Sequence, residues 1–520
     1  MKANVPSSKR STAEPVSKTG VWTQLFGIDV RALAVFRMAM GLLLLVDLGI
    51  RSTDLGVMYT DGGMFSRAEI CYRVMTPWNW SFHFGGGSLG YQAILFGIAA
   101  VLAVALLVGF ETRLATIGSW LMLLSLHHRV PPILSGADVL LRMLLFWGMF
   151  LPLGQVASLD RWRALKRGQA GEVTDRPVVS IATVAMLLQM PLMYFLSAIF
   201  KTNPVWMSGE VLAGALSHDF YVSRLGTYLL QFPGPLRLLT WATLVLEWVG
   251  PVLLFSPWRT GRLRTFFVGC FAALHVGIIV CLEVDLFSFV ALTGLTLFLP
   301  SEIWRAKRFA GLWRVLGEGP VASPSPTSVS GALPVWSQWG VGMALVYVLL
   351  TNVAGLPSRP LGRLAPDQWR FFATALGLGQ KWNMFEVVPS KPGWYVARAR
   401  LTDGSEVDLL RGGVPVDWAR PAFPAGIYPN YRWRKVFREM AYEDELGYHA
   451  FREPIARYLC RDWNRRHGSD RQVVEFDLVY NMSRVARHDV QQGAQITIRD
   501  RLIRWEISRL EEDRTTRTRL

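Results

Sequence analysis

Charged residues are scarce in this sequence. Asp, Glu, Lys and Arg together make up 18% of the 520 residues, whereas a soluble chain carries about 25%. Apolar residues make up 51%, and several apolar runs are long enough to cross about 30 Å of hydrocarbon as helices. The low charge argues against an ordinary soluble domain, and the apolar runs predict a polytopic α-helical membrane protein.

Cysteine is rarer still. The four cysteines form no CxxC or Cys/His pattern, although zinc modules require such spacing and disulfide scaffolds are dense in cysteine. These two classes are therefore excluded, and we expect no metal. The first twenty residues also lack the apolar core of a cleavable signal peptide. We expect residues 1–20 to be a cytoplasmic tail and the first span to act as the insertion signal.

Hydropathy predicts nine membrane spans within a domain of residues 21–355. The third, fourth and eighth are short, so one of them is a candidate for a re-entrant or tilted segment. The nine spans lie near residues 31–50, 90–110, 114–127, 139–154, 178–200, 236–255, 265–282, 286–300 and 336–354.

Positive charge is in excess, with a formal net charge of +16. Lys and Arg gather in the N-terminal tail and in the loops after spans four, six and eight, without a basic groove motif, so membrane lipids explain the charge better than nucleic acid. Cytoplasmic loops carry such an excess. We predict a protein of a bacterial inner membrane with a cytoplasmic N-terminus and a cytoplasmic Pro/Ser-rich linker at 316–334.

Beyond residue 355 the sequence pattern changes. Two alternating segments flank a Thr-Asp-Gly turn at Asp403-Gly404, which predicts a hairpin. Residues 356–520 are therefore predicted to form a small extracytoplasmic, periplasmic α+β domain. The other predicted elements are helices at 431–445 and 448–466 and strands at 472–480 and 494–507.

Ionisable residues lie in or beside the predicted spans: Asp138, Arg142, Lys201, Glu247 and His275. An intramembrane charge is costly unless it is paired or lines a wet cavity, so the set predicts a polar internal site. Each residue has a structural alternative. Asp138 and Arg142 can form a salt bridge on one helix face, Glu247 can pair with another helix, His275 can have a structural role, and Lys201 can snorkel to the headgroups.

Five segments carry a further signal: FRMAMGLLLLVDLGIRSTDLGVMYTDGG, DVLLRMLLFWGMFLPLGQVASLD, FKTNPVWMSG, LEWVGPVLLF and LHVGIIVCLEVDLFSFV. Taken in this order, they resemble the HTTM domain, the membrane domain shared by vitamin K-dependent gamma-carboxylase and many bacterial relatives. The resemblance covers about residues 20 to 300.

The resemblance assigns roles to residues. In the carboxylases, a lysine five residues before a tryptophan is the reaction's base, which matches Lys201 and Trp206. A family histidine that lines the same site matches His275. The resemblance implies that Lys201 deprotonates a reduced, vitamin K-type quinone, which then reacts with O2, and that CO2 takes part in carboxylation. The residues expected to bind substrate are Asp138, Arg142, Trp206 and Glu247.

One motif departs from the carboxylases. They carry an Asn-His pair ahead of the fourth span, where this chain has Gly136 and Ala137. The C-terminal part is also shorter and contains no clear propeptide-binding region. These differences argue against glutamate carboxylation, and favour another quinone-linked or lipid-linked modification on the extracytoplasmic side.

Two other functions stay open. The chain can be a non-catalytic maturation or immunity factor that binds a secreted peptide or a lipid. A transporter is the third hypothesis, although no inverted repeat or pair of broken helices is visible.

The predicted topology divides the cysteines into two pairs. Cys270 and Cys281 lie in one span, eleven residues apart and thus about 16 Å along a helix, too far for a disulfide. Cys71 and Cys460 both lie in the oxidising compartment. A disulfide between Cys71 and Cys460, or two free thiols, are the alternatives.

The orientation is tested with reporter fusions. A reporter that is active only in the periplasm is expected to work when fused after residue 360 and to fail when fused near residue 170. The reverse pattern would place Lys201 on the cytoplasmic side and contradict the assignment of the two faces.

Overall fold

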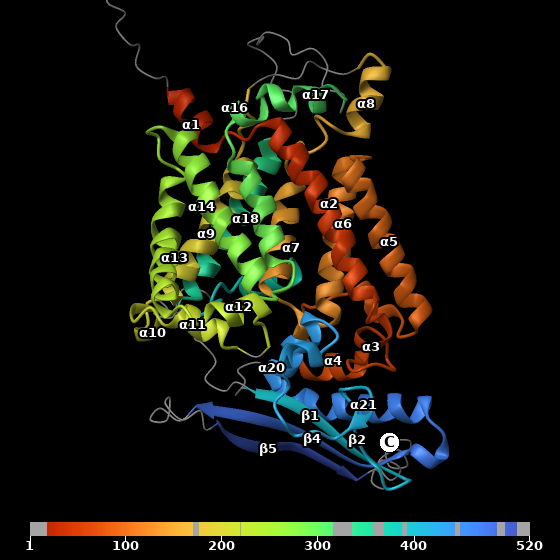
Figure 1. Ribbon diagram of the computed structural model, residues 1–520. Helices are drawn as coiled ribbons and strands as arrows, with labels where there is room; N and C mark the ends of the chain where they lie inside the picture. The colour runs from red at the N-terminus through yellow and green to blue at the C-terminus, as the bar shows by residue number, and fades with distance from the viewer. Residues whose placement is uncertain are drawn as a thin grey trace, which may run out of the picture.

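The computed structural model describes residues 18–169, 176–218, 220–315, 335–356, 369–386, 393–441, 448–485 and 495–506. It consists of a helical bundle and a sheet, with α20 (Tyr431–Ala441) and α21 (Arg452–Arg466) between them (Figure 1). The predicted linker at 316–334 and most of the predicted N-terminal tail lie outside the described residues.

A helix occupies each of the nine segments that hydropathy identifies. Six of the described helices are long and apolar enough to cross a membrane, which fits a polytopic membrane protein, while the count of nine spans stays a prediction. The six are α2 (Val30–Ser52), α5 (Leu89–Val108), α9 (Ile181–Phe200), α13 (Pro233–Leu253), α14 (Thr260–Cys281) and α18 (Val335–Ala354). The three shorter ones are α6 (Thr112–Arg129), α7 (Gly136–Gly148) and α15 (Phe287–Leu295).

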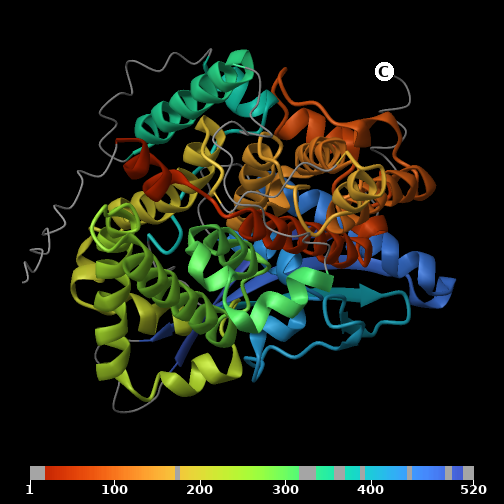
Figure 2. The ribbon, with the colours of Figure 1, turned by 90° about the horizontal axis from the view of Figure 1, so that it is seen from above.

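The short helix α7 lies at the centre of the bundle. It contacts α6, α9 and α15, and apart from Gly136 and Val139 all of its residues are buried. By contrast α5, α13 and α14 expose apolar side chains on their outer faces, as helices in contact with lipid do. Seen from above, the orange helices lie on one side and the yellow-green helices on the other (Figure 2).

Short helices cover both ends of the bundle (Figure 1). The end away from the sheet carries α1 (Lys18–Phe26), α8 (Leu159–Lys166), α16 (Ser301–Trp304) and α17 (Lys307–Val315). The end near the sheet carries α3 (Leu55–Met58), α4 (Arg67–Arg73), α10 (Pro204–Met207), α11 (Val211–Leu216) and α12 (Arg224–Leu229). The basic helices α8 and α17 thus lie opposite the sheet, as the sequence predicts, and the assignment of that end to the cytoplasm stays a prediction.

The C-terminal part is an antiparallel five-stranded sheet in the order β3-β2-β1-β4-β5. The hairpin turns at Gly404, whose φ of 85° favours glycine. One face carries Tyr395, Ala397, Phe476 and Leu478, in one apolar cluster with residues of α20 and α21. The predicted hairpin and strands are confirmed, as are the two helices, of which the first is seen over Tyr431–Ala441 while residues 442–445 lie outside the described residues. The strands are β1 (Gly393–Leu401), β2 (Glu406–Asp408), β3 (Val414–Pro415), β4 (Val473–Val485) and β5 (Gln495–Glu506).

The cysteines decide between the two alternatives. Cys71 and Cys460 are both free, so the disulfide considered from the sequence is not formed. Cys71 lies exposed on α4, whereas Cys460 is 2% exposed, in the apolar cluster of α21 and the sheet. Two sulfurs in such different environments do not meet. Cys270 and Cys281 are half-buried and also free.

Thiol labelling tests this arrangement. A maleimide is expected to label Cys71 in the native protein within minutes and to spare Cys460, because burial raises the pKa of the Cys460 thiol to about 12 and the thiolate is the reactive form. Cys71→Ser serves as the control and should remove the rapid label. Recovery of a Cys71–Cys460 disulfide peptide from unreduced protein would contradict the structure.

Candidate functional site

Lys201 is buried and paired. It follows the last residue of α9, and its Nζ donates to both carboxylate oxygens of Glu247 on α13, at 2.6 Å each. Lys201 is 3% exposed and Glu247 is 5% exposed. Snorkelling is therefore ruled out for Lys201, and the inter-helix pairing considered for Glu247 is observed.

A tight turn places Trp206 over the lysine. Asn203 caps α10 by accepting a hydrogen bond from the Trp206 backbone amide, and Pro204 at the first helical position fits that start. The Trp206 ring centre then lies 4.9 Å from Lys201 Nζ, a cation–π contact. Among the described residues, the third N–H of Lys201 has no hydrogen-bond partner.

His275 occupies a second buried unit beside the first. Its Nε2 lies 2.7 Å from the Tyr194 hydroxyl and its Nδ1 lies 3.3 Å from Ser288 Oγ. Tyr194 lies on α9, and Lys201 follows seven residues later at the end of that helix. Seven residues are about two turns, so the two side chains lie on the same helix face, about 10 Å apart along the axis. The structure therefore places Lys201, Glu247 and His275 on one side of α9.

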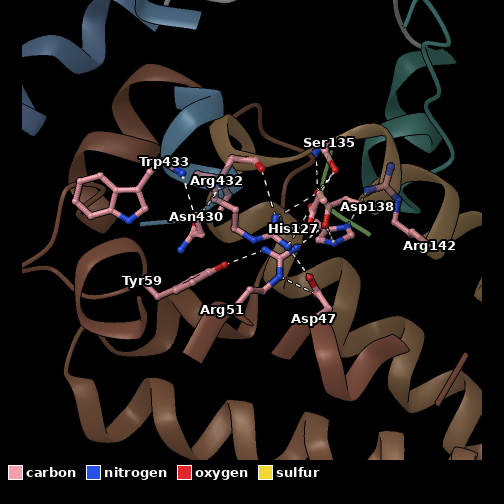
Figure 3. Close-up of polar contacts among 12 residues, drawn as sticks. Asp47, Arg51, Tyr59, His127, Ser135, Asp138, Arg142, Asn430, Arg432 and Trp433 are labelled. Atoms are coloured by element: carbon pink, nitrogen blue, oxygen red, sulfur yellow. Dashed lines mark hydrogen bonds and ion pairs between the residues drawn. The ribbon is translucent and has the colours of Figure 1, made fainter. Parts of the chain in front are cut away.

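Asp138 belongs to a different group, a buried ion cluster at the end of the bundle near the sheet (Figure 3). We define this ion cluster as the carboxylates of Asp47, Asp138 and Asp285 with the guanidinium groups of Arg51 and Arg432. Arg51 donates to Asp47 Oδ2 at 2.7 Å and to Asp138. A capping box places Asp138, because its Oδ2 accepts from the Ser135 backbone amide at 2.7 Å.

Arg432 brings the C-terminal domain into this cluster. Its Nη2 lies 2.5 Å from Asp47 Oδ1 and 3.7 Å from Asp285 Oδ2, and its Nη1 lies 3.5 Å from Asp138 Oδ2. Burial lowers the pKa of Arg432, but the three carboxylates raise it above its ordinary value, so the group stays charged. Arg432 is 2% exposed and thus fixes α20 against the bundle.

Arg142 does not pair with Asp138, contrary to the salt bridge considered from the sequence. Its Nε donates to the Gly377 carbonyl at 2.7 Å and its Nη2 to the Gly379 carbonyl at 3.4 Å. Its Nη1 lies 3.0 Å from His127 Nδ1. Arginine only donates, so Nδ1 accepts and the proton of neutral His127 is on Nε2, which faces Asp138 Oδ1 at 3.4 Å.

Sequence reasoning missed the segment that Arg142 holds. Residues 376–386, which we call the strap, are part of the predicted extracytoplasmic domain but run without helix between helices of the bundle. Gln380 bonds Gln189 on α9 at 2.8 Å. Gly377 has a φ of 62°, and a Cβ added there would lie 2.7 Å from Arg142 Nε, so the position requires glycine. The Gly377-Leu378-Gly379 sequence was the signal from which this non-helical segment could have been predicted.

The strap runs from Arg142 to the residues that cover Lys201. At its end, Trp206 Nε1 donates to the Phe385 carbonyl at 2.9 Å and Asn203 Nδ2 to the Glu386 carbonyl at 2.6 Å. Met384 fills the space above Gly136, where a Cβ would lie 2.8 Å from its sulfur. That Cβ would also lie 3.6 Å from the ring of Phe287, which packs on His275. The strap therefore covers the site from Trp206 toward the end of α7.

The fold and the site define a polytopic helical membrane protein with a buried polar centre and a docked extramembrane domain. The HTTM domain model matches residues 27–304. The chain therefore belongs to the HTTM domain family. Comparisons with curated proteins and with solved structures find no match.

The ion cluster yields a stability prediction. Asp47→Asn breaks the buried pairs that Asp47 makes with Arg51 and Arg432, and the loss of one partner from a buried pair costs about 3 to 5 kcal/mol. We expect a clear fall in the thermal unfolding midpoint in detergent. Asp462→Asn, which breaks a pair with the 69% exposed Arg466 side chain, is the matched control and should cost under about 1 kcal/mol. Equal midpoints for the two variants would refute the cluster's role.

Proposed function

We propose that this protein is a membrane enzyme in which Lys201 acts as a base on an amphiphilic substrate that reaches the site from the bilayer. The observation that carries the proposal is the buried Lys201–Glu247 pair beneath Trp206. A lysine that served only to anchor a helix end would place its ammonium in the headgroups. Here it lies inside the bundle, beside a second buried polar pair, Tyr194 and His275.

The pair can hold a neutral amine. Burial penalises both charges, so an ammonium with a carboxylate and an amine with a carboxylic acid become closer in free energy than in water. When Glu247 holds the proton, the Lys201 amine is free to accept one from the substrate. Trp206 shields the lysine on one side and keeps water away from the reacting nitrogen.

His275 and Tyr194 supply the second polar contact. Their hydrogen bond of 2.7 Å joins a group that exchanges protons to a hydroxyl that can donate or accept. The rings of Phe271 and Phe287 pack on Tyr194 and His275. This set suits a flat molecule with polar groups at its edges. We therefore propose Lys201 and His275 as catalytic groups, with Glu247 and Trp206 as their binding partners.

A reduced quinone of the vitamin K type fits these donors, because it would supply an acidic phenolic hydroxyl and the electrons for a reaction with O2. Lys201 would take the hydroxyl proton, and the Tyr194–His275 pair would hold a second polar group. Gly136 leaves no side chain beside this site and Met384 fills the space, so we do not propose carboxylation by CO2. The modification is proposed to occur at the periplasmic side of a bacterial inner membrane.

Access from lipid supports an amphiphilic substrate. The site lies between α9, α13, α14 and α15, and α13 and α14 expose apolar side chains such as Val245, Val249, Val276 and Val280. The strap and α20 cover the end near the sheet. A hydrophobic substrate is therefore proposed to enter between helices, and a secreted peptide or protein would meet the site only after these elements move.

The test replaces the base. Purified protein in lipid nanodiscs is supplied with a reduced vitamin K-type quinone and air, and epoxide formation is followed by mass spectrometry. Lys201→Ala is expected to lower the rate by at least about 100-fold, the usual contribution of a general base. Lys166→Ala is the matched control, because Lys166 makes a cation–π contact with Trp162 at 4.0 Å on the opposite end of the bundle.

Two results would contradict the proposal. Full activity of Lys201→Ala would remove the lysine from the chemistry. No epoxide from the unaltered protein, together with a peptide that co-purifies in place of a quinone, would instead favour a maturation or immunity factor that binds without turnover.

A further inference from the structure

Arg142 contacts two parts of the chain that are far apart in sequence. On one side it donates to the strap carbonyls of Gly377 and Gly379. On the other it bonds His127, which faces Asp138 in the ion cluster. Arg142 is 7% exposed, so its hydrogen bonds are made away from bulk water.

Docking of the C-terminal domain changes the charge near Arg142. Three carboxylates of the ion cluster face Arg51 and Arg432, and Arg142 is a third guanidinium group beside them, linked to Asp138 through His127 (Figure 3). Arg432 is the only contribution of α20 to this set of six groups. Withdrawal of α20 would leave three carboxylates with two guanidinium groups.

Arg142 has a second partner within reach. Asp138 precedes it by four residues on α7, so the two side chains lie on the same helix face. In the docked structure Asp138 is held by Arg51 and Arg432, and Arg142 is directed to the strap. Loss of Arg432 would give Asp138 a free acceptor position for Arg142, at the expense of the bonds to Gly377 and Gly379.

We propose that Arg142 is a positioning residue with two alternative partners, and that docking of the C-terminal domain selects between them. With Arg432 inserted, Arg142 holds the strap; without it, Arg142 turns to Asp138 and the strap loosens. The far end of the strap bonds Trp206, which covers Lys201. Docking of the domain therefore controls closure of the site, and its consequence for turnover rests on the proposed function.

Hydrogen exchange of the full-length protein tests this without any activity assay. In Arg432→Gln, exchange of peptides that cover residues 376–386 should be about tenfold faster, as expected when charge-assisted hydrogen bonds to a buried segment are lost. Arg434→Gln is the matched control on the same helix; Arg434 pairs with Glu283, and its loss should leave the strap unchanged. Peptides from α9 report whether the bundle stays folded.

The decisive variant is the double substitution Arg432→Gln with Asp138→Asn. It removes the competing carboxylate and restores equal numbers of opposite charges, so Arg142 should return to the strap and exchange should return to that of the unaltered protein. Strap exchange that stays fast in the double variant overturns the proposal, as does unchanged strap exchange in Arg432→Gln.

A conservative variant covers the case in which Arg432→Gln unfolds the bundle. Arg142→Lys keeps the charge, but a lysine cannot reproduce the planar fork that reaches both carbonyls. Strap exchange should rise in this variant and stay unchanged in Arg264→Lys, another buried arginine that donates to backbone carbonyls, at the other end of the bundle. Equal strap exchange in both lysine variants refutes a positioning role for Arg142.

Discussion

Pairing of opposite charges in the buried ion cluster is the constraint on which the arrangement of the two domains depends. Asp47, Asp138 and Asp285 come from the bundle, and Arg432 comes from a helix nearly 300 residues further along the chain than Asp138. Removal of one partner from a buried pair is far more costly than loss of a surface pair. These carboxylates are therefore stably buried only when α20 is in place. The position of α20 in turn determines the position of the sheet that packs on it.

A second constraint acts on the strap. Irregular backbone that is buried needs hydrogen-bond partners for its N–H and C=O groups. The strap meets this requirement with side-chain donors from the bundle, among them Arg142, Trp206 and Asn203. Several polar residues of the apolar segments thus have a common explanation. They hold a piece of non-helical chain across the site, and Lys201 and Glu247 remain as the pair that the strap covers.

Some of this could be predicted from the sequence with local rules. Long apolar runs identified the helices because lipid selects for them, and Asp403-Gly404 identified the hairpin because its turn requires a positive φ. The spacing of Lys201 and Trp206 singled out both residues through the family resemblance, whereas their contact became visible only in the structure, where the short capped helix α10 joins them. The partners of Asp138 and Arg142 could not be predicted. Helical spacing shows which two side chains can pair on one helix face, but it does not show which groups from distant segments bind them instead.

The sequence by itself determined the class of the protein, the helices of its bundle, the α+β character of its C-terminal part and the residues that carry charge into the membrane. All of these follow from composition and short-range periodicity. Only the tertiary structure decided that Lys201 is paired with Glu247, that Cys71 and Cys460 lie in separate environments, and that the strap lies in the bundle. Each of these depends on contacts between segments that are far apart in the chain. Burial determines which partner a charged group has, and the local sequence around that group does not reveal the partner.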